Sequence, residues 1–176
     1  MVAYLQRRNP SVPGIINKLY PPQERKLEKV NKYWKMILQV EPVRDIYADQ
    51  LLDAGEISID HFVPWSYVAH DELWNLNPTT KSANSSKSSL LPEWNLYFPK
   101  LCEIEFLSYQ VIWKYERIHK EFEICRKEHI NNEDVMRSLY REGLSKQEFF
   151  KHLEQVVYPV YQSAQNMGFK EWTYEK

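Results

Sequence analysis

The chain has few glycines and few cysteines for its 176 residues, and each shortage argues against a class of protein. Its four glycines form neither a P-loop nor a dinucleotide-binding fingerprint, which argues against the common nucleotide-binding folds. Its two cysteines, Cys102 and Cys125, lie far apart, so they form neither a disulfide framework nor a zinc-binding pair. We expect both to be buried, reduced thiols.

Long apolar runs and a strong charge of one sign are also missing. No window approaches the roughly 18 apolar residues of a membrane span, and the first residues do not resemble a signal peptide. We therefore expect a cytoplasmic protein with no membrane partner. The formal net charge of −1 gives no overall attraction to nucleic acid. Residues 1–50 are nevertheless basic and residues 51–92 acidic, and an acidic stretch suits a metal cation better than a bare phosphate.

The first part of the chain combines an irregular arm with helical patterns. Hydrophobic residues make up 43% of the sequence, enough for a real core. An apolar stripe at helical spacing predicts a helix that begins at Pro22 and ends before Pro42. A second, short helix is predicted over residues 43–52.

Strand signals appear only in the middle of the sequence. Alternating residues over 57–62 predict a strand, and residues 73–80 predict a weaker strand that pairs with it. Ser82 or Asn84 can cap a short helix that follows. Beyond it, apolar periodicity predicts helices over 97–130, 133–142 and 145–165, the last with a capping box and a kink or break at Pro159.

The fold class predicted by these patterns is α+β, with a small strand–strand–helix unit embedded in a mainly helical domain. We divide the chain into an N-terminal arm with helices (1–56), the strand–strand–helix unit (57–92) and a C-terminal helical region (93–176). Together they form one compact domain, which could itself be part of a longer protein.

Residues suited to phosphodiester hydrolysis are concentrated in the middle unit. Asp60 and His61 end the first strand, Asn75 comes before the second, and Asn84 and Lys87 follow on the short helix. Such a reaction needs a base that activates water, and histidine, with a pKa of about 6.5, is suited to this. One carboxylate and one amide oxygen can hold a Mg²⁺ ion that keeps several of its waters.

These residues, in this order, resemble the HNH endonuclease motif, also called the ββα-metal finger. The resemblance covers about a fifth of the chain, and it implies a metal-dependent endonuclease that hydrolyses nucleic-acid phosphodiester bonds. It implies that His61 is the general base and that Asp60 and Asn84 bind one Mg²⁺ or Mn²⁺ ion. It further implies that Asn75 holds the loop that aims His61, and that Lys87 contacts a phosphate.

The sequence departs from the many HNH domains that carry two zinc-binding cysteine pairs, so we expect no structural zinc. Duplex DNA is the expected substrate, and Arg7 and Arg8 in the basic arm are candidate contacts to its backbone. Sequence specificity is then low or supplied by another domain or subunit, as in a defence or restriction system. Two alternatives stay open, namely a non-catalytic DNA- or protein-binding module and an RNase.

Two local expectations test this interpretation. Neighbouring side chains on a regular strand point to opposite faces, so Asp60 and His61 could not share one metal site there, and we expect the strand to end or bulge at this pair. Continuous regular pairing with the two side chains pointing apart would contradict the catalytic assignment. A solvated loop is the simpler interpretation of His70, Asp71 and Glu72, with a further ligand cluster as the alternative. The serine-rich residues 82–89 would be a flexible linker on composition alone, but the spacing of Asn84 and Lys87 favours a helix.

Overall fold

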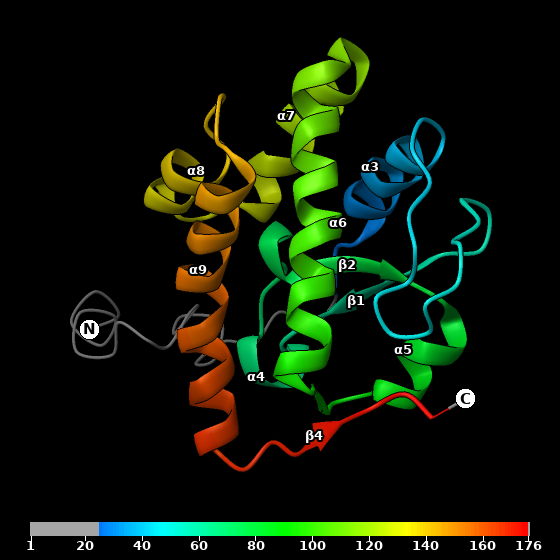
Figure 1. Ribbon diagram of the computed structural model, residues 1–176, viewed down its shortest axis with the longest axis vertical. Coiled ribbons are helices and arrows are strands. Elements are labelled where there is room, and N and C mark those ends of the chain that lie inside the picture. The colour runs from blue at the N-terminus through cyan, green and yellow to red at the C-terminus, as the bar shows by residue number, and fades with distance from the viewer. Residues whose placement is uncertain (1–24, 176) are drawn as a thin grey trace.

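Two short antiparallel strands and a seven-residue helix pack among longer helices in the computed structural model, which describes residues 25–175 (Figure 1). Strand β1 (Ser58–His61) pairs with β2 (Leu76–Thr79) from Ser58 opposite Thr79 to His61 opposite Leu76. Their connection contains helix α4 (Trp65–Val68) and a 3-10 turn, η1 (Leu73–Asn75). The predicted pair of strands is therefore confirmed, with the first part of the second strand replaced by η1.

Helix α5 (Lys81–Lys87) follows β2 directly and completes the strand–strand–helix unit. Its cap is Thr80, whose hydroxyl accepts a hydrogen bond from the amide of Ala83 (3.2 Å), rather than Ser82 or Asn84. Because the cap lies next to the last residue of β2, the chain passes from strand to helix without a linker. The serine-rich stretch is thus helical over most of its length.

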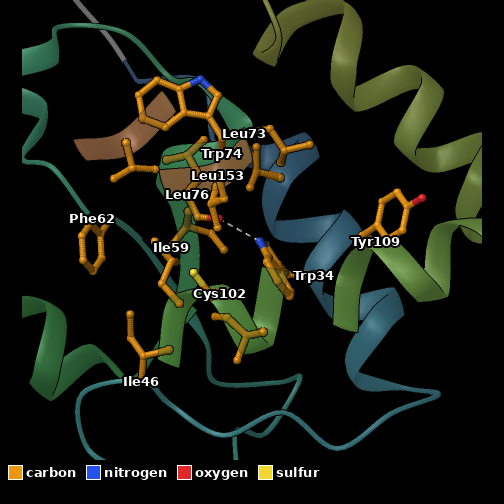
Figure 2. Close-up of a cluster of buried hydrophobic side chains, with 14 of the residues drawn as sticks. Trp34, Ile46, Ile59, Phe62, Leu73, Trp74, Leu76, Cys102, Tyr109 and Leu153 are labelled. Carbon is orange, nitrogen blue, oxygen red and sulfur yellow. Dashed lines mark hydrogen bonds between the residues drawn. The ribbon is translucent and has the colours of Figure 1, made fainter. Parts of the chain in front are cut away.

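Five helices surround this unit, and the α+β class is confirmed. They are α3 (Glu28–Leu38), α6 (Trp94–Lys114), α7 (Glu116–His129), α8 (Glu133–Leu139) and α9 (Lys146–Asn166). Figure 2 shows the apolar side chains between them and the strands, including Ile59 and Leu76 from the sheet and Leu153 from α9. The indole nitrogen of Trp34 in α3 donates to the carbonyl of Leu76 (3.0 Å), which fixes α3 against β2.

Several helix boundaries differ from the sequence predictions. Helix α3 begins at Glu28 rather than at Pro22, which lies outside the described residues. The long helix predicted over 97–130 is two helices, because Tyr115 adopts an extended backbone (φ −124°, ψ 111°) between α6 and α7. Helix α8 ends at Leu139, earlier than predicted. Helix α9 begins with the predicted capping box at Ser145 and is not split at its proline.

The predicted helix over 43–52 is wrong. This segment consists of turns closed by a β-bridge between Arg44 and Leu51. The buried Asp45 carboxylate accepts the amides of Tyr47 (2.8 Å) and Ala48 (3.3 Å), which gives the backbone a local alternative to helical hydrogen bonds. Asp45 also accepts hydrogen bonds from the hydroxyl of Thr79 and the amide of Thr80, and so ties the turns to the β2–α5 junction.

A pair of two-residue strands that the sequence did not predict joins the C-terminal segment to the end of the unit. Strand β3 (Leu91–Pro92) runs parallel to β4 (Glu171–Trp172). The Trp172 ring stacks on Tyr97 with ring centroids 5.9 Å apart. In Figure 1, β4 passes below α6 toward α5, so the C-terminal segment braces the exit of the unit.

Both cysteines are buried and free, as predicted. Burial, together with nearby carboxylates, raises the pKa of Cys102 and of Cys125 to about 12, so both stay protonated thiols at neutral pH. Among the helices of residues 25–175, none has the length and apolar character needed to cross a membrane.

Candidate active site

Asp60 is the penultimate residue of β1, and its side chain is buried. The ammonium of Lys87, at the end of α5, donates to Asp60 Oδ1 (3.2 Å) and lies 3.1 Å from Oδ2. The hydroxyl of Tyr47 donates to Oδ2 (2.6 Å). A buried carboxylate needs such partners, because an unpaired charge out of water is very costly.

Lys87 is completely buried, and it also donates to the carbonyl of His61 (2.7 Å). Burial lowers its pKa from the ordinary lysine value, and Asp60 offsets part of this effect. In this conformation Lys87 is therefore an internal anchor between α5 and the end of β1. A phosphate contact requires a side chain at the surface, and the structure does not place Lys87 there.

Tyr47 supplies the third group around Asp60, and the sequence analysis did not single it out. Burial raises its pKa well above the ordinary tyrosine value, and the Asp60 carboxylate raises it further. The phenol is therefore protonated and donates to Asp60. Its contact could not be predicted, because the turns at residues 43–52 had been interpreted as a helix.

His61 faces a different partner from its neighbour. Its Nε2 lies 2.7 Å from Asp71 Oδ1, and the two side chains are 4% and 13% exposed. Asp71 belongs to the loop between α4 and η1, and its Oδ2 accepts the backbone amide of Lys26 (3.0 Å). The solvated loop predicted over residues 70–72 is wrong, because His70 and Glu72 are buried and Asp71 pairs with His61.

The carboxylates of this loop are shifted in opposite directions. Burial alone would raise the pKa of Asp71, but hydrogen bonds from His61 and from the Lys26 amide outweigh it, and the pKa lies below the ordinary value. Burial raises the pKa of Glu72, although the side chain of Asn131 donates to it (2.9 Å). Asp71 is thus the carboxylate of the loop that is held ionised.

Asn75 is fully buried and is bound to the backbone just beyond His61. Its Oδ1 accepts the amide of Val63 (2.7 Å), and its Nδ2 donates to the carbonyl of the same residue (2.9 Å). The backbone between Asn75 and the strand is closed by a further bond from the amide of Phe62 to the carbonyl of Asn75 (2.9 Å). These contacts are of the kind that the predicted loop-holding role requires.

Asn84 lies on α5 and faces β1. Its Nδ2 donates to the hydroxyl of Ser58 (2.6 Å) and, at 3.4 Å, to the carbonyl of Ile59. Because the amide nitrogen is held by the strand, the oxygen Oδ1 is the atom left for a ligand. A carboxylate oxygen and an amide oxygen, the donor types that Asp60 and Asn84 carry, are hard ligands of the kind that Mg²⁺ takes.

In the described part of the chain, no three His, Cys, Asp or Glu side chains form a group that could hold a metal ion. A divalent ion at Asp60 and Asn84 would therefore depend on water and substrate for its other ligands.

The end of β1 is more regular than predicted. The strand does stop at His61, but there is no bulge, since Asp60 and His61 pair in register with Asn77 and Leu76. Strand geometry alone thus directs the two side chains to opposite faces. Asp60 meets α5 and the turns before β1, whereas His61 meets the loop before η1. The expected strand end is thus present at His61, but the expected bulge is wrong, and the regular pairing counts against one metal site shared by both residues.

Arg7 and Arg8, the predicted backbone contacts, lie outside the described residues. The other predicted site residues all lie within the strand–strand–helix unit and the loop that closes it, namely Asp60, His61, Asn75, Asn84 and Lys87. The residues missed by sequence reasoning are Tyr47 and Asp71. Asp71 left a weak signal, since it belongs to the acidic pair between the two strands.

Comparison with known proteins bears directly on this site. Residues 43–93 match the family model described as HNH endonuclease. The resemblance inferred from the sequence is therefore confirmed over this segment, which makes up less than a third of the chain. The match includes the turns that carry Asp45 and Tyr47. Searches of curated proteins and of solved structures found no match to the chain. An HNH domain indicates, in general terms, nuclease activity, a nucleic-acid substrate and use of a divalent metal.

Proposed function

We propose that this protein, with its HNH endonuclease segment at residues 43–93, is a metal-dependent endonuclease that hydrolyses phosphodiester bonds of duplex DNA. The observation that carries the proposal is the arrangement around β1, where the base candidate His61 and the ligand candidates Asp60 and Asn84 are each held by defined partners. The acidic tilt of residues 51–92 supports a bound cation in this unit.

The opposite directions of Asp60 and His61 suit an in-line displacement. In that reaction the attacking water and the leaving oxygen lie on opposite sides of the phosphorus. A base for the water and a cation for the leaving oxygen must then flank the phosphate rather than meet at one point. Adjacent residues at the end of a strand can serve the two sides of one phosphate.

His61 is the proposed base, and it accepts the proton of the attacking water. Asp60 and Asn84 Oδ1 would hold Mg²⁺ or Mn²⁺, which when bound neutralises charge on the leaving 3′ oxygen. Asn75 fixes the backbone after His61 through Val63. Lys87 and Tyr47 hold the Asp60 carboxylate in place before an ion arrives.

Substrate contacts outside the site belong to the same proposal. Arg7 and Arg8 in the basic arm are proposed contacts to the DNA backbone, where positive charge gives affinity without sequence information. Sequence specificity would then come from another domain or subunit, and a defence or restriction system is the biological setting that we propose for such a nuclease.

Plasmid nicking in the presence of Mg²⁺ or Mn²⁺ tests the proposal. We expect nicking by the wild type and a loss of about 10²–10⁴-fold in His61→Ala, the range that a general base contributes. His152→Ala is the matched control, because this histidine lies on α9 outside the site and is partly exposed.

The alternatives give different results in the same assay. Equal nicking by wild type and His61→Ala would contradict the role of His61. Cleavage of RNA but not of DNA would identify an RNase. Binding of DNA without cleavage in any divalent metal would identify a non-catalytic binding module.

A further inference from the structure

We infer that Asp71 is the positioning residue for His61, and that it fixes the imidazole with its proton on Nε2 and leaves Nδ1 as the nitrogen that faces the attacking water. The inference carries the proposed nuclease function one step further and rests on it for its catalytic consequence. No motif residue of the sequence analysis has this role, and Asp71 had been interpreted as part of a solvated loop.

The contact itself is short and largely shielded from water. Nε2 of His61 lies 2.7 Å from Asp71 Oδ1, and the exposed fractions of the two side chains are 4% and 13%. Within residues 25–175, the hydrogen bond of this ring is made through Nε2. A charge-assisted hydrogen bond in such surroundings is stronger and more directional than one at an open surface.

Asp71 is itself held from two other parts of the chain. The amide of Lys26, just before α3, donates to the free carboxylate oxygen Oδ2 (3.0 Å). Nδ1 of the buried His129, the last residue of α7, lies 2.8 Å from the carbonyl of Asp71. The carboxylate is therefore fixed at its backbone and at both oxygens. A chance surface pairing would not need these supports.

The neighbouring loop residue strengthens the attachment to the helices. The carboxylate of Glu72 accepts from the side chain of Asn131 (2.9 Å) and from the backbone amide of that residue (3.3 Å to each oxygen). Asn131 follows α7, so two consecutive loop residues are bound to the same end of this helix. The position of the His61 ring thus depends on the helical surroundings as well as on the strand that carries it.

The chemistry of the pair determines which nitrogen is protonated. An ionised carboxylate only accepts hydrogen bonds, so the nitrogen that faces Asp71 must carry the proton. Nδ1 of the neutral ring then has its lone pair free. In the reaction, a water proton passes to Nδ1 as the water oxygen bonds to phosphorus. The bond from phosphorus to the 3′ oxygen breaks, and that oxygen is protonated from solvent. Asp71 stabilises the imidazolium without taking a proton.

Asp71→Asn separates this role from simple packing. If the asparagine oxygen keeps the Lys26 amide, its NH₂ group faces His61 Nε2 and donates to it. The ring proton then moves to Nδ1, which can no longer accept a proton from water. The same exchange in a serine-protease triad, a worked example of this effect, costs about 10⁴-fold in kcat. We expect a loss of about 10²–10⁴-fold in kcat with little change in KM.

Nitrogen-15 NMR of the histidine rings reads the protonation site directly, without DNA or metal. We expect the wild-type His61 spectrum to show protonated Nε2 and unprotonated Nδ1, and the Asp71→Asn spectrum to show the reverse. His61→Ala assigns the signals. Asp53→Asn, the same change at an exposed turn, serves as the control in both the NMR and the nicking assays, and it should resemble the wild type.

Each result bears on the inference by itself. A wild-type ring protonated on Nδ1 would overturn it, and this measurement does not depend on whether the variant folds. An unchanged tautomer or unchanged kcat in folded Asp71→Asn would also overturn it. A tautomer that depends on Asp71 in a protein that cleaves nothing would uphold the positioning of His61 and would reject the proposed nuclease function instead.

Discussion

Asp60 and His61, the last two residues of β1, differ in which part of the fold supplies their partners. Asp60 and Lys87 are 5% and 0% exposed in their side chains, and both belong to the strand–strand–helix unit. The His61 side chain is as enclosed as that of Asp60, at 4%, and its partner Asp71 is 13% exposed. The supports of Asp71 come from outside that unit, at Lys26 and the end of α7. Adjacent positions in the sequence thus lead to two different environments.

The comparison separates holding a charge from moving a proton. In the first pair, Lys87 and Tyr47 hold the Asp60 carboxylate in place from two sides. In the His61–Asp71 pair, the imidazole contacts Asp71 through Nε2 and has its other nitrogen left to accept a proton. Under the proposed function, Asp60 with Asn84 would hold the cation and the His61–Asp71 pair would take the proton. The following predictions test that division.

The largest expected effect is a loss of stability when the Asp60–Lys87 ion pair is broken. Lys87→Met should lower the free energy of unfolding by about 3–5 kcal/mol, because Asp60 would keep a buried charge without its ion pair. Urea unfolding measures this value. Lys81→Met, on an exposed position of the same helix, should change it by less than about 0.5 kcal/mol. Adding Asp60→Asn to Lys87→Met should restore part of the loss, and a further fall would contradict the pairing.

Asn75→Ala removes the side chain that holds the backbone just after His61. It should destabilise the protein by about 2–4 kcal/mol, because the buried amide and carbonyl of Val63 both lose a partner. Nicking should fall as well, since the backbone after His61 is no longer held. Thermal unfolding and plasmid nicking are the measurements. Asn95→Ala, at an exposed position of α6, is the control and should match the wild type in both.

The lowered pKa of Asp71 predicts a pH dependence of stability. The pKa of Asp71 is lower in the folded protein than its ordinary value of 3.8, so folding favours the ionised form. Its contribution of about 1–2 kcal/mol is complete above pH 3.8 and is lost as the pH falls through the lower, folded value. The difference in unfolding free energy between wild type and Asp71→Asn should therefore shrink from pH 5 to pH 2.5. A constant difference over this range would show that the ionised form is not favoured.

The smallest effect sharpens the assignment of the metal. Mg²⁺ or Mn²⁺ at about ten times its Kd should stabilise the wild type by about 1.4 kcal/mol. The same addition should leave Asp60→Asn and Asn84→Ala unchanged, and it should still stabilise Asp71→Asn. Comparing each variant with and without the ion, by thermal unfolding, removes the effect of the substitution itself. If Asp71→Asn were no longer stabilised by the ion, the ion would depend on Asp71, and its assignment to Asp60 and Asn84 would be contradicted.

The strands and the short helix could be predicted from sequence because their signals are local. Alternation over 57–62, the proline that follows, and the spacing of Asn84 and Lys87 identified the unit, and the family match confirms it. The turns at residues 43–52 were mispredicted because Asp45 bonds to Thr79 and Thr80, which are distant in sequence. No helical propensity at 43–52 can reveal that competition.

The candidate site was predictable in its residue types but not in its contacts. Lys87 was expected at a phosphate and is instead buried against Asp60, and Asp71 was expected in solvent and instead holds His61. Helix α7 also buries His129, whose ring contacts the loop that carries Asp71. Contacts of this kind depend on how α5 and α7 pack, and packing is not encoded in any short window.

The sequence by itself determined which chemical groups are present. They are a histidine beside an aspartate at the end of a strand, followed along the chain by two asparagines and a lysine. Only the tertiary structure decided which groups meet. A strand directs neighbouring side chains to opposite faces. A buried polar or charged group is then stable only where the fold places a partner beside it. For Asp60 that partner came from α5, and for His61 it came from a loop fixed by α7.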